Sequence, residues 1–95
     1  LIIMAHCTYE NLSDLEPILA LIRSLDRIKE RKPGIFYLKS RGFLHFHEKN
    51  GKRWADVRDG ENWGSEVPIS LNPDQEEMDA FFREVRRRHQ ATLET

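Results

Sequence analysis

The first clear pattern of apolar positions along the chain is helical. From Leu15 to Leu25, apolar residues recur at intervals of three and four, which places them on one face of a helix. Ser13 precedes this run as a candidate N-cap, and Pro17 falls in the first turn, where a missing N–H costs little. Because the residue before a proline avoids helical geometry, we expect this helix to end at Lys32-Pro33-Gly34.

Four strands are predicted next, because short runs rich in β-branched and aromatic residues are separated by turn residues. The runs cover residues 35–39, 43–48, 53–58 and 67–71. Asn50-Gly51 is a typical pair for a type I′ turn, and Gly42 can supply the left-handed residue of a three-residue turn at 40–42. Pro68 has no N–H to donate, which indicates that the fourth strand lies at an edge of the sheet.

A second helical pattern follows these strands. We expect Asn72 to cap this helix and Pro73 to be its first residue. Its apolar face is formed by Met78, Phe81, Phe82 and Val85, and is extended by His89 and Leu93. Acidic residues crowd its start and Arg86-Arg87-Arg88 its end, which complements the helix dipole and allows pairs such as Glu84–Arg88. We interpret the arginines first as helix-stabilising and only second as a patch for an anionic ligand.

The order of these elements predicts an α+β fold. We expect a helix, a four-stranded antiparallel meander and a second helix, with both helices on one face of the sheet. Ninety-five residues is the size of a single domain. Residues 1–95 are therefore predicted to form one domain, in which residues 1–11 are an N-terminal segment that is free to be flexible.

The register of the central hairpin follows from its two-residue turn. If Asn50-Gly51 forms that turn, Lys49 opposes Lys52. The next pairs are Glu48–Arg53, His47–Trp54, Phe46–Ala55, His45–Asp56, Leu44–Val57 and Phe43–Arg58. Since side chains alternate along a strand, one face is wholly apolar and suits the two helices. That face is predicted to hold Leu44, Phe46, Ala55 and Val57, together with Phe36 and Leu38.

The opposite face of the predicted sheet has an unusual composition. It carries Tyr37, Phe43, His45, His47, Trp54, Asp56 and Arg58. Monomers seldom leave a large aromatic patch bare, and such a patch usually marks an interface or a ligand site. Three interpretations are open: the Trp63 loop or the N-terminal segment covers this face, a second copy of the chain binds it to form a homodimer, or it holds a small molecule or a metal.

The two histidines of this face allow a narrower hypothesis. His45 and His47 are two residues apart on one strand, which places both rings on the same side about 6–7 Å apart, a spacing suited to chelating a divalent transition metal. Asp56 is a candidate third ligand, and water a fourth. Alternatively, the Asp56 carboxylate orients His45 as a general base, with His6 or Cys7 brought close by the N-terminal segment. The plainest interpretation is a stabilising cross-strand pair of His45 and Asp56.

Charge and composition limit the partners. A net charge of −1 argues against a dedicated nucleic-acid binder, which needs a basic excess. The single cysteine, Cys7, excludes an internal disulfide and fits a reducing compartment. The apolar run Leu1-Ile2-Ile3 is too short for a signal peptide or a membrane span, and Met4 has the appearance of a natural start. We therefore expect a cytoplasmic protein with no membrane partner, and we predict no cofactor beyond the divalent transition metal considered above.

The central hairpin also carries a resemblance. Phe43-Leu44-His45-Phe46-His47-Glu48 is followed, after a short glycine turn, by Ala55-Asp56-Val57-Arg58. This resembles a hairpin in a group of small bacterial proteins that reads Phe-x-His-Phe-His and then Ala-Asp-Val-Arg; some of them carry the label "luciferase domain". The resemblance covers residues 35–88, with a shorter segment here between residues 58 and 67. It implies a similar fold for the hairpin and brings no catalytic residues with it.

Two classes of function follow from the sequence. The first is a non-enzymatic binding or self-associating module that uses the aromatic and histidine face of its sheet. The second is a small metal-dependent or His/Asp-based enzyme centred on His45, His47 and Asp56. A mass that depends on concentration would favour the first class, and metal retained through purification would favour the second.

Overall fold

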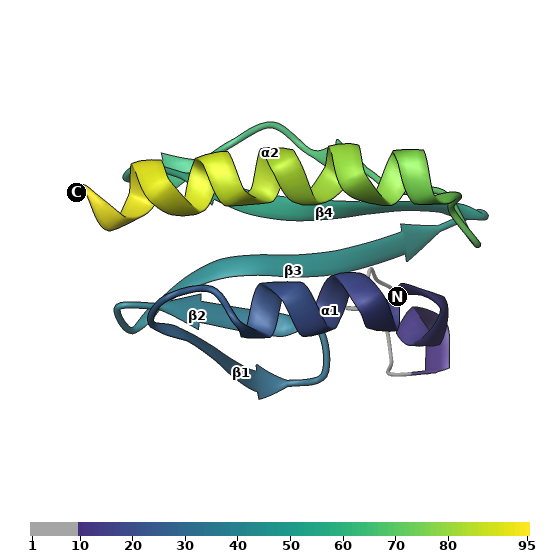
Figure 1. Ribbon diagram of the computed structural model, residues 1–95, viewed down its shortest axis with the longest axis horizontal. Helices are drawn as coiled ribbons and strands as arrows, with labels where there is room; N and C mark the ends of the chain where they lie inside the picture. Colours follow the sequence, from purple (N-terminus) through teal and green to yellow (C-terminus); the bar gives the residue numbers. More distant parts are fainter. Residues whose placement is uncertain (1–9) are drawn as a thin grey trace.

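Two helices and an antiparallel sheet make up the part of the chain that the computed structural model describes, residues 10–95 (Figure 1). The elements in chain order are η1 (Glu10–Leu15), α1 (Glu16–Arg23), β1 (Ile28–Lys32), β2 (Ile35–Leu38), β3 (Arg41–Lys49), β4 (Lys52–Asp59), β5 (Asn62–Trp63), β6 (Val67–Pro68) and α2 (Gln75–Leu93). The strand order is β1-β2-β3-β4, and the short strands β5 and β6 both pair with β4. The predicted α+β class with an antiparallel sheet is confirmed.

The sheet has six strands rather than the predicted four, chiefly because the first helix is shorter than expected. α1 ends at Arg23, and Arg27 adopts a left-handed φ of 66°. Residues 28–32, predicted to belong to the helix, form the edge strand β1 against β2. This stretch contains a single apolar residue, Ile28, so its sequence pattern favours neither a helix nor a strand, and pairing with the edge of β2 decides the outcome. The other added strand, β5, comes from the segment predicted to be a loop.

Both helix caps differ from the prediction. Ser13 lies inside the 3-10 helix η1, and Leu15 occupies the N-cap of α1 without a side-chain cap. Pro17 is in the first turn, as predicted. α2 is capped by Asp74, whose carboxylate accepts a hydrogen bond from the Glu77 N–H at 2.8 Å, while Asn72 has a left-handed φ of 50° before the helix. Aspartate is among the favoured N-cap residues, and the Glu77 carboxylate accepts from the Ser70 N–H rather than closing a capping box with Asp74.

The central hairpin has the predicted turn and register. Asn50 and Gly51 have φ values of 54° and 77°, as a type I′ turn requires. Pairing runs without interruption from Lys49–Lys52 to Leu44–Val57, and the predicted last pair, Phe43–Arg58, is not part of it. His45 therefore opposes Asp56, and His47 opposes Trp54, as the sequence predicted.

The turn before this hairpin differs from the prediction and moves Phe43 to the other face. Lys39 and Ser40, not Gly42, take the left-handed conformations, so the turn has two residues. The register then shifts between Phe36–Leu44 and Tyr37–Gly42, which leaves Phe43 as the extra residue of a β-bulge. Phe43 is fully buried in the core, although it was predicted on the opposite face.

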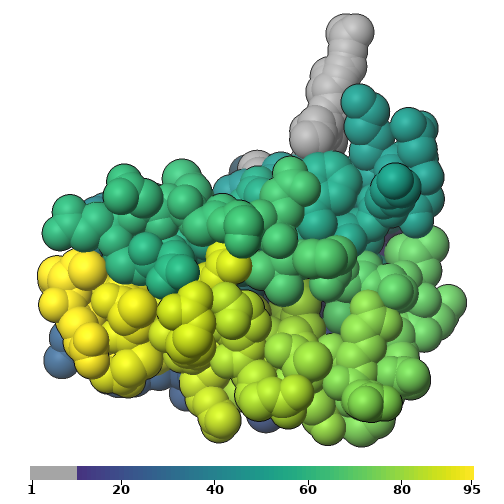
Figure 2. All heavy atoms as spheres, turned by 90° about the horizontal axis from the view of Figure 1, so that it is seen from above, coloured from purple at the N-terminus to yellow at the C-terminus, as the bar shows by residue number. Residues whose placement is uncertain are grey.

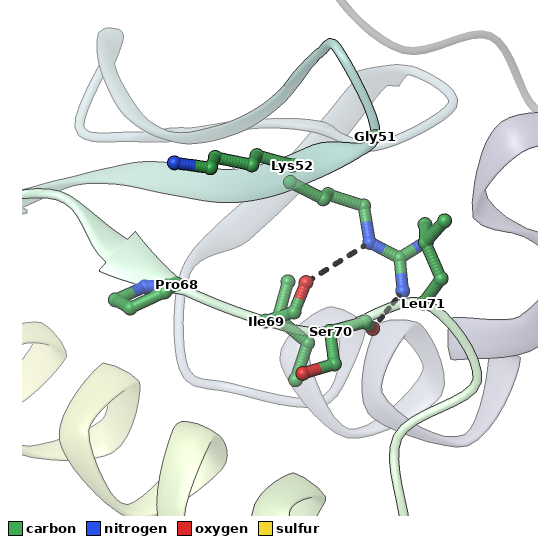
Figure 3. A pocket seen from close by; sticks show the side chains of 7 residues that line it. Gly51, Lys52, Pro68, Ile69, Ser70 and Leu71 are labelled. Carbon is green, nitrogen blue, oxygen red and sulfur yellow. Dashed lines mark hydrogen bonds between the residues drawn. The ribbon is translucent and has the colours of Figure 1, made fainter.

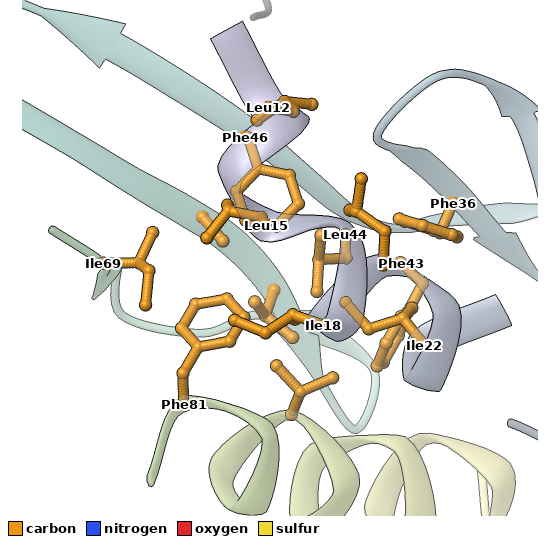
Figure 4. Packing of buried hydrophobic residues seen from close by; sticks show 14 of the residues in the cluster. Leu12, Leu15, Ile18, Ile22, Phe36, Phe43, Leu44, Phe46, Ile69 and Phe81 are labelled. Atoms are coloured by element: carbon orange, nitrogen blue, oxygen red, sulfur yellow. The ribbon is translucent and has the colours of Figure 1, made fainter. Parts of the chain in front are cut away.

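The core lies between the two helices and one face of the sheet (Figure 4). Its buried members are Leu12, Leu15, Ile18, Leu19, Ile22, Phe36, Leu38, Phe43, Leu44, Phe46, Ala55, Val57, Ile69, Phe81 and Val85. The predicted alternation of the last strand holds as far as Ile69, but Leu71 is 47% exposed. The apolar face deduced from the hairpin register is thus confirmed, and Phe43 is added to it.

A buried arginine connects three segments at one end of the sheet. The side chain of Arg53 is fully buried and makes a two-pronged ion pair with Asp14 of η1 at 2.8 and 2.9 Å. The same guanidinium donates to the carbonyl oxygens of Ile69 and Ser70 (Figure 3) and to that of Asn11. The hydrogen bonds that Arg53 donates to the Asp14 carboxylate are the main reason why the pKa of Asp14 is lowered. Arg53 therefore joins β4 to η1 and to the segment before α2.

A second buried arginine joins α2 to the outer edge of β4, where the two pack against each other (Figure 2). Arg88 donates to the carbonyl oxygens of Val57 and Ser65 at 3.0 and 2.9 Å. It also pairs with Glu84 at 2.7 Å, the pair predicted from the sequence. Hydrogen bonds from Arg87 and Arg88 lower the pKa of Glu84 to about 2. The arginine run therefore stabilises tertiary packing as well as the helix.

Candidate metal centre

The sheet face turned away from the helices carries six of the seven residues that the sequence placed there. We call it the open face, and it comprises Tyr37, His45, His47, Trp54, Asp56 and Arg58, joined by Trp63 of β5. Phe43 is the exception, because the bulge turns it into the core. The open face is built on the central strands β3 and β4, whose regular register fixes its side chains in place.

His45, His47 and Asp56 converge at the centre of the open face. His45 Nδ1 lies 2.8 Å from His47 Nε2, and His47 Nε2 lies 2.9 Å from Asp56 Oδ2. The third distance, from His45 Nδ1 to Asp56 Oδ2, is 3.9 Å. One potential ligand atom from each residue thus falls within 4.8 Å of the other two.

Hydrogen bonds alone do not account for both close contacts of His47 Nε2. His47 Nε2 lies within hydrogen-bond distance of both His45 Nδ1 and Asp56 Oδ2. In a neutral ring this nitrogen carries either one hydrogen or one lone pair, so it cannot make a good hydrogen bond to both partners. A cation between the three atoms would accept a lone pair from each of them and remove the conflict.

Two tryptophans flank the histidines. The Trp63 ring meets His45 edge-on at 5.0 Å, and Trp54 stacks on His47 at 5.6 Å. The guanidinium of Arg58 lies 4.7 Å from the Trp63 ring centroid and donates to the Gly42 carbonyl at 2.7 Å. Trp63 thus lies beside His45 at one end of the open face, and 44% of it stays exposed.

The three converging residues differ in their access to solvent. His47 is buried, with 10% of its side chain exposed, whereas 20% of the His45 side chain and 32% of that of Asp56 are exposed. The tryptophans therefore shield the imidazoles while the carboxylate side remains reachable. An ion at this position could be reached from solvent on the carboxylate side.

The geometry changes one detail of the predicted pairing. The strand register sets Asp56 opposite His45, but its close contact is the diagonal one, with His47. At 3.9 Å the His45–Asp56 contact exceeds hydrogen-bond length, so the carboxylate orients His47 rather than the predicted general base. His6 and Cys7, the proposed additional groups, lie outside the described residues. Trp63 was missing from the predicted site residues, and its isolation in a polar, glycine-containing stretch was the available signal.

Comparisons with known proteins leave this site without a counterpart. No family model, curated protein or solved structure matches the chain. The resemblance of the hairpin to the small bacterial proteins therefore stays a prediction. Neither helix in the described part of the chain is long and apolar enough to cross a membrane.

Proposed function

We propose that this domain binds a divalent transition-metal ion through His45 Nδ1, His47 Nε2 and Asp56 Oδ2. The observation that supports this function is the convergence of the three atoms to distances of 2.8, 2.9 and 3.9 Å. Nitrogen and oxygen ligands lie about 2.0–2.2 Å from zinc, which sets neighbouring ligand atoms roughly 3–3.5 Å apart. The three atoms need only small side-chain rotations to reach that geometry.

The ligand types fit such an ion. Two imidazoles and one carboxylate bind zinc in catalytic sites, and the same set binds non-haem iron(II). Three protein ligands leave at least one coordination position for water. The exposed side of Asp56 offers a route for that water, so the site would suit a reactive ion better than a purely structural one.

Calorimetric titration with zinc tests the proposal. Wild type is expected to bind one equivalent, and His45→Ala/His47→Ala is expected to lose the binding. Since only neutral imidazole ligates a metal, binding should release protons and weaken below about pH 6. Tryptophan fluorescence should change along with the heat, because Trp54 and Trp63 contact the two ligand rings.

Asp56→Asn is the matched test of the carboxylate. It is expected to weaken zinc binding by about tenfold or more, whereas Asp79→Asn, on the exposed part of α2, should leave the affinity unchanged. Indistinguishable titrations of wild type and His45→Ala/His47→Ala would contradict the proposal. A wild-type dissociation constant weaker than ~100 μM would contradict it as well.

Self-association through the open face is the second candidate function. The observation that favours it is the large exposed fraction of Trp63, 44%, beside the other aromatic residues of this face. If two copies pair here, wild type should sediment as a dimer at micromolar concentration, and Trp63→Lys should be a monomer. Leu21→Lys, at an equally exposed apolar residue of α1, is the control that should stay dimeric. A wild-type monomer at millimolar concentration would exclude this candidate.

A further inference from the structure

A hollow lined by basic residues lies at the β1–β2 side of the sheet, away from the metal ligands. It has a volume of about 290 Å³ and is lined by Arg27, Lys29, Arg31, Tyr37, Lys39 and Ser40. We call it the basic hollow. Four of these six side chains are cationic and none is a carboxylate. Asp26 lies nearby, 3.7 Å from the Arg27 guanidinium, in an ion pair exposed to solvent.

The backbone brings these residues together from two turns. β1 runs antiparallel to β2 with Ile28 opposite Leu38. Arg27, just before β1, and Lys39, just after β2, therefore meet at the same end of the strand pair. Arg27, Lys39 and Ser40 all have left-handed φ values, of 66°, 55° and 67°. Such values are uncommon outside glycine and asparagine, so the hollow depends on three unusual conformations.

One of the cations is oriented without a counter-charge, and a second lies beside it on β1. The guanidinium carbon of Arg31 lies 4.7 Å from the Tyr37 ring centroid, which orients its planar fork. Lys29 stands directly opposite Tyr37 across the strand pair. Lys39 is already engaged, because its amine donates to the Leu93 and Thr95 carbonyl oxygens. Among the described residues, Lys29 and Arg31 have no carboxylate partner.

We propose that the basic hollow binds a small anion through a phosphate group, either free phosphate or a small phosphate monoester. Gathered like charges repel one another, and an anion between them relieves this repulsion. The arginine fork matches two phosphate oxygens, and the lysine supplies a third charge-assisted donor. The net charge of the chain is −1, so this local positive field is not part of a general basic excess.

The test is an NMR titration of wild type with inorganic phosphate, with chloride added to keep ionic strength constant. Saturable shifts are expected at the backbone amides of residues 27–31 and 37–40. Lys29→Gln/Arg31→Gln should weaken binding by at least about tenfold, because it removes two charged donors. Both side chains are exposed, so this variant should fold normally, as its circular dichroism and melting temperature will show.

The matched control is Lys49→Gln/Lys52→Gln, which removes the same charge from exposed positions at the end of the central hairpin. It should change the phosphate affinity by less than about twofold. A titration with glycerol phosphate distinguishes free phosphate from a phosphate monoester as the ligand. Tighter binding of glycerol phosphate than of phosphate would identify a monoester, and equal or weaker binding would identify the free ion. Shifts that do not saturate, or equal losses in the two double variants, would overturn the proposal. Because Lys29 and Arg31 are not metal ligands, the outcome is independent of zinc binding.

Discussion

Replacing Arg53 by methionine is expected to lower the free energy of unfolding by about 3–5 kcal/mol. The Arg53 side chain is fully buried, and its guanidinium is paired with Asp14 and with backbone carbonyl oxygens from two other segments. Methionine fills a similar volume but leaves the Asp14 carboxylate and these carbonyl groups without their donor. Breaking one side of a buried ion pair costs far more than the pair itself contributes. Urea unfolding followed by circular dichroism measures the loss.

Arg23→Met is the matched control for this prediction. Arg23 also contacts two carboxylates, those of Glu16 and Glu30, but its side chain is 36% exposed. Water solvates these charges when the arginine is removed, so the loss should be no more than about 1 kcal/mol. Similar losses of unfolding free energy in Arg53→Met and Arg23→Met would mean that the ion pair between Arg53 and Asp14 does not behave as a buried one.

Phe43→Ala is expected to cost about 3–5 kcal/mol, because it opens a cavity in a packed core. The expectation depends on the β-bulge, which turns Phe43 toward the helices and brings its ring 6.0 Å from that of His89. On a regular strand the same residue would lie on the open face, where truncation costs far less. Denaturant unfolding of this variant therefore measures the effect of the bulge directly.

Trp63→Ala provides the comparison for Phe43. Trp63 is larger but 44% exposed on the open face, so its loss should cost less than about 1.5 kcal/mol. If Phe43→Ala were no more destabilising than Trp63→Ala, Phe43 would belong to the open face and the bulge would be wrong.

The sequence was sufficient where structure depends on neighbouring residues. Asn50-Gly51 determines its own turn, and a two-residue turn leaves one register for the whole hairpin. That register predicted the apolar face of the sheet and the opposing positions of His45 and Asp56. The helix α2 was also predicted from the sequence, because Phe81 and Val85 follow a single helical period.

The errors arose where distant segments decide the structure. Residues 28–32 contain one apolar residue, Ile28, and their pattern is compatible with either a helix or a strand; pairing with β2 makes them a strand. Phe43 changes face because the Lys39-Ser40 turn is one residue shorter than the sequence indicated. In both cases the local pattern was compatible with two structures, and tertiary pairing selected one.

The same distinction applies to the candidate site, where some features follow from the local sequence and others depend on the three-dimensional structure. The convergence of the three proposed ligands on one face follows from strand alternation, and the sequence predicted that face for His45, His47 and Asp56. The diagonal contact between His47 and Asp56 does not follow from strand alternation, because it depends on side-chain rotation. The basic hollow was also beyond prediction, because it requires the left-handed conformations at residues 27, 39 and 40.

Imidazole ¹⁵N NMR of the zinc-loaded protein tests the metal site most directly. With one equivalent of zinc, we expect His45 Nδ1 and His47 Nε2 to take the chemical shifts of metal-bound nitrogen. His89 is an internal control, because its Nε2 is buried 2.8 Å from the Asp26 carbonyl oxygen, and its signals should not move. Unchanged signals from His45 and His47, or equal changes in His89, would contradict a metal centre on the open face.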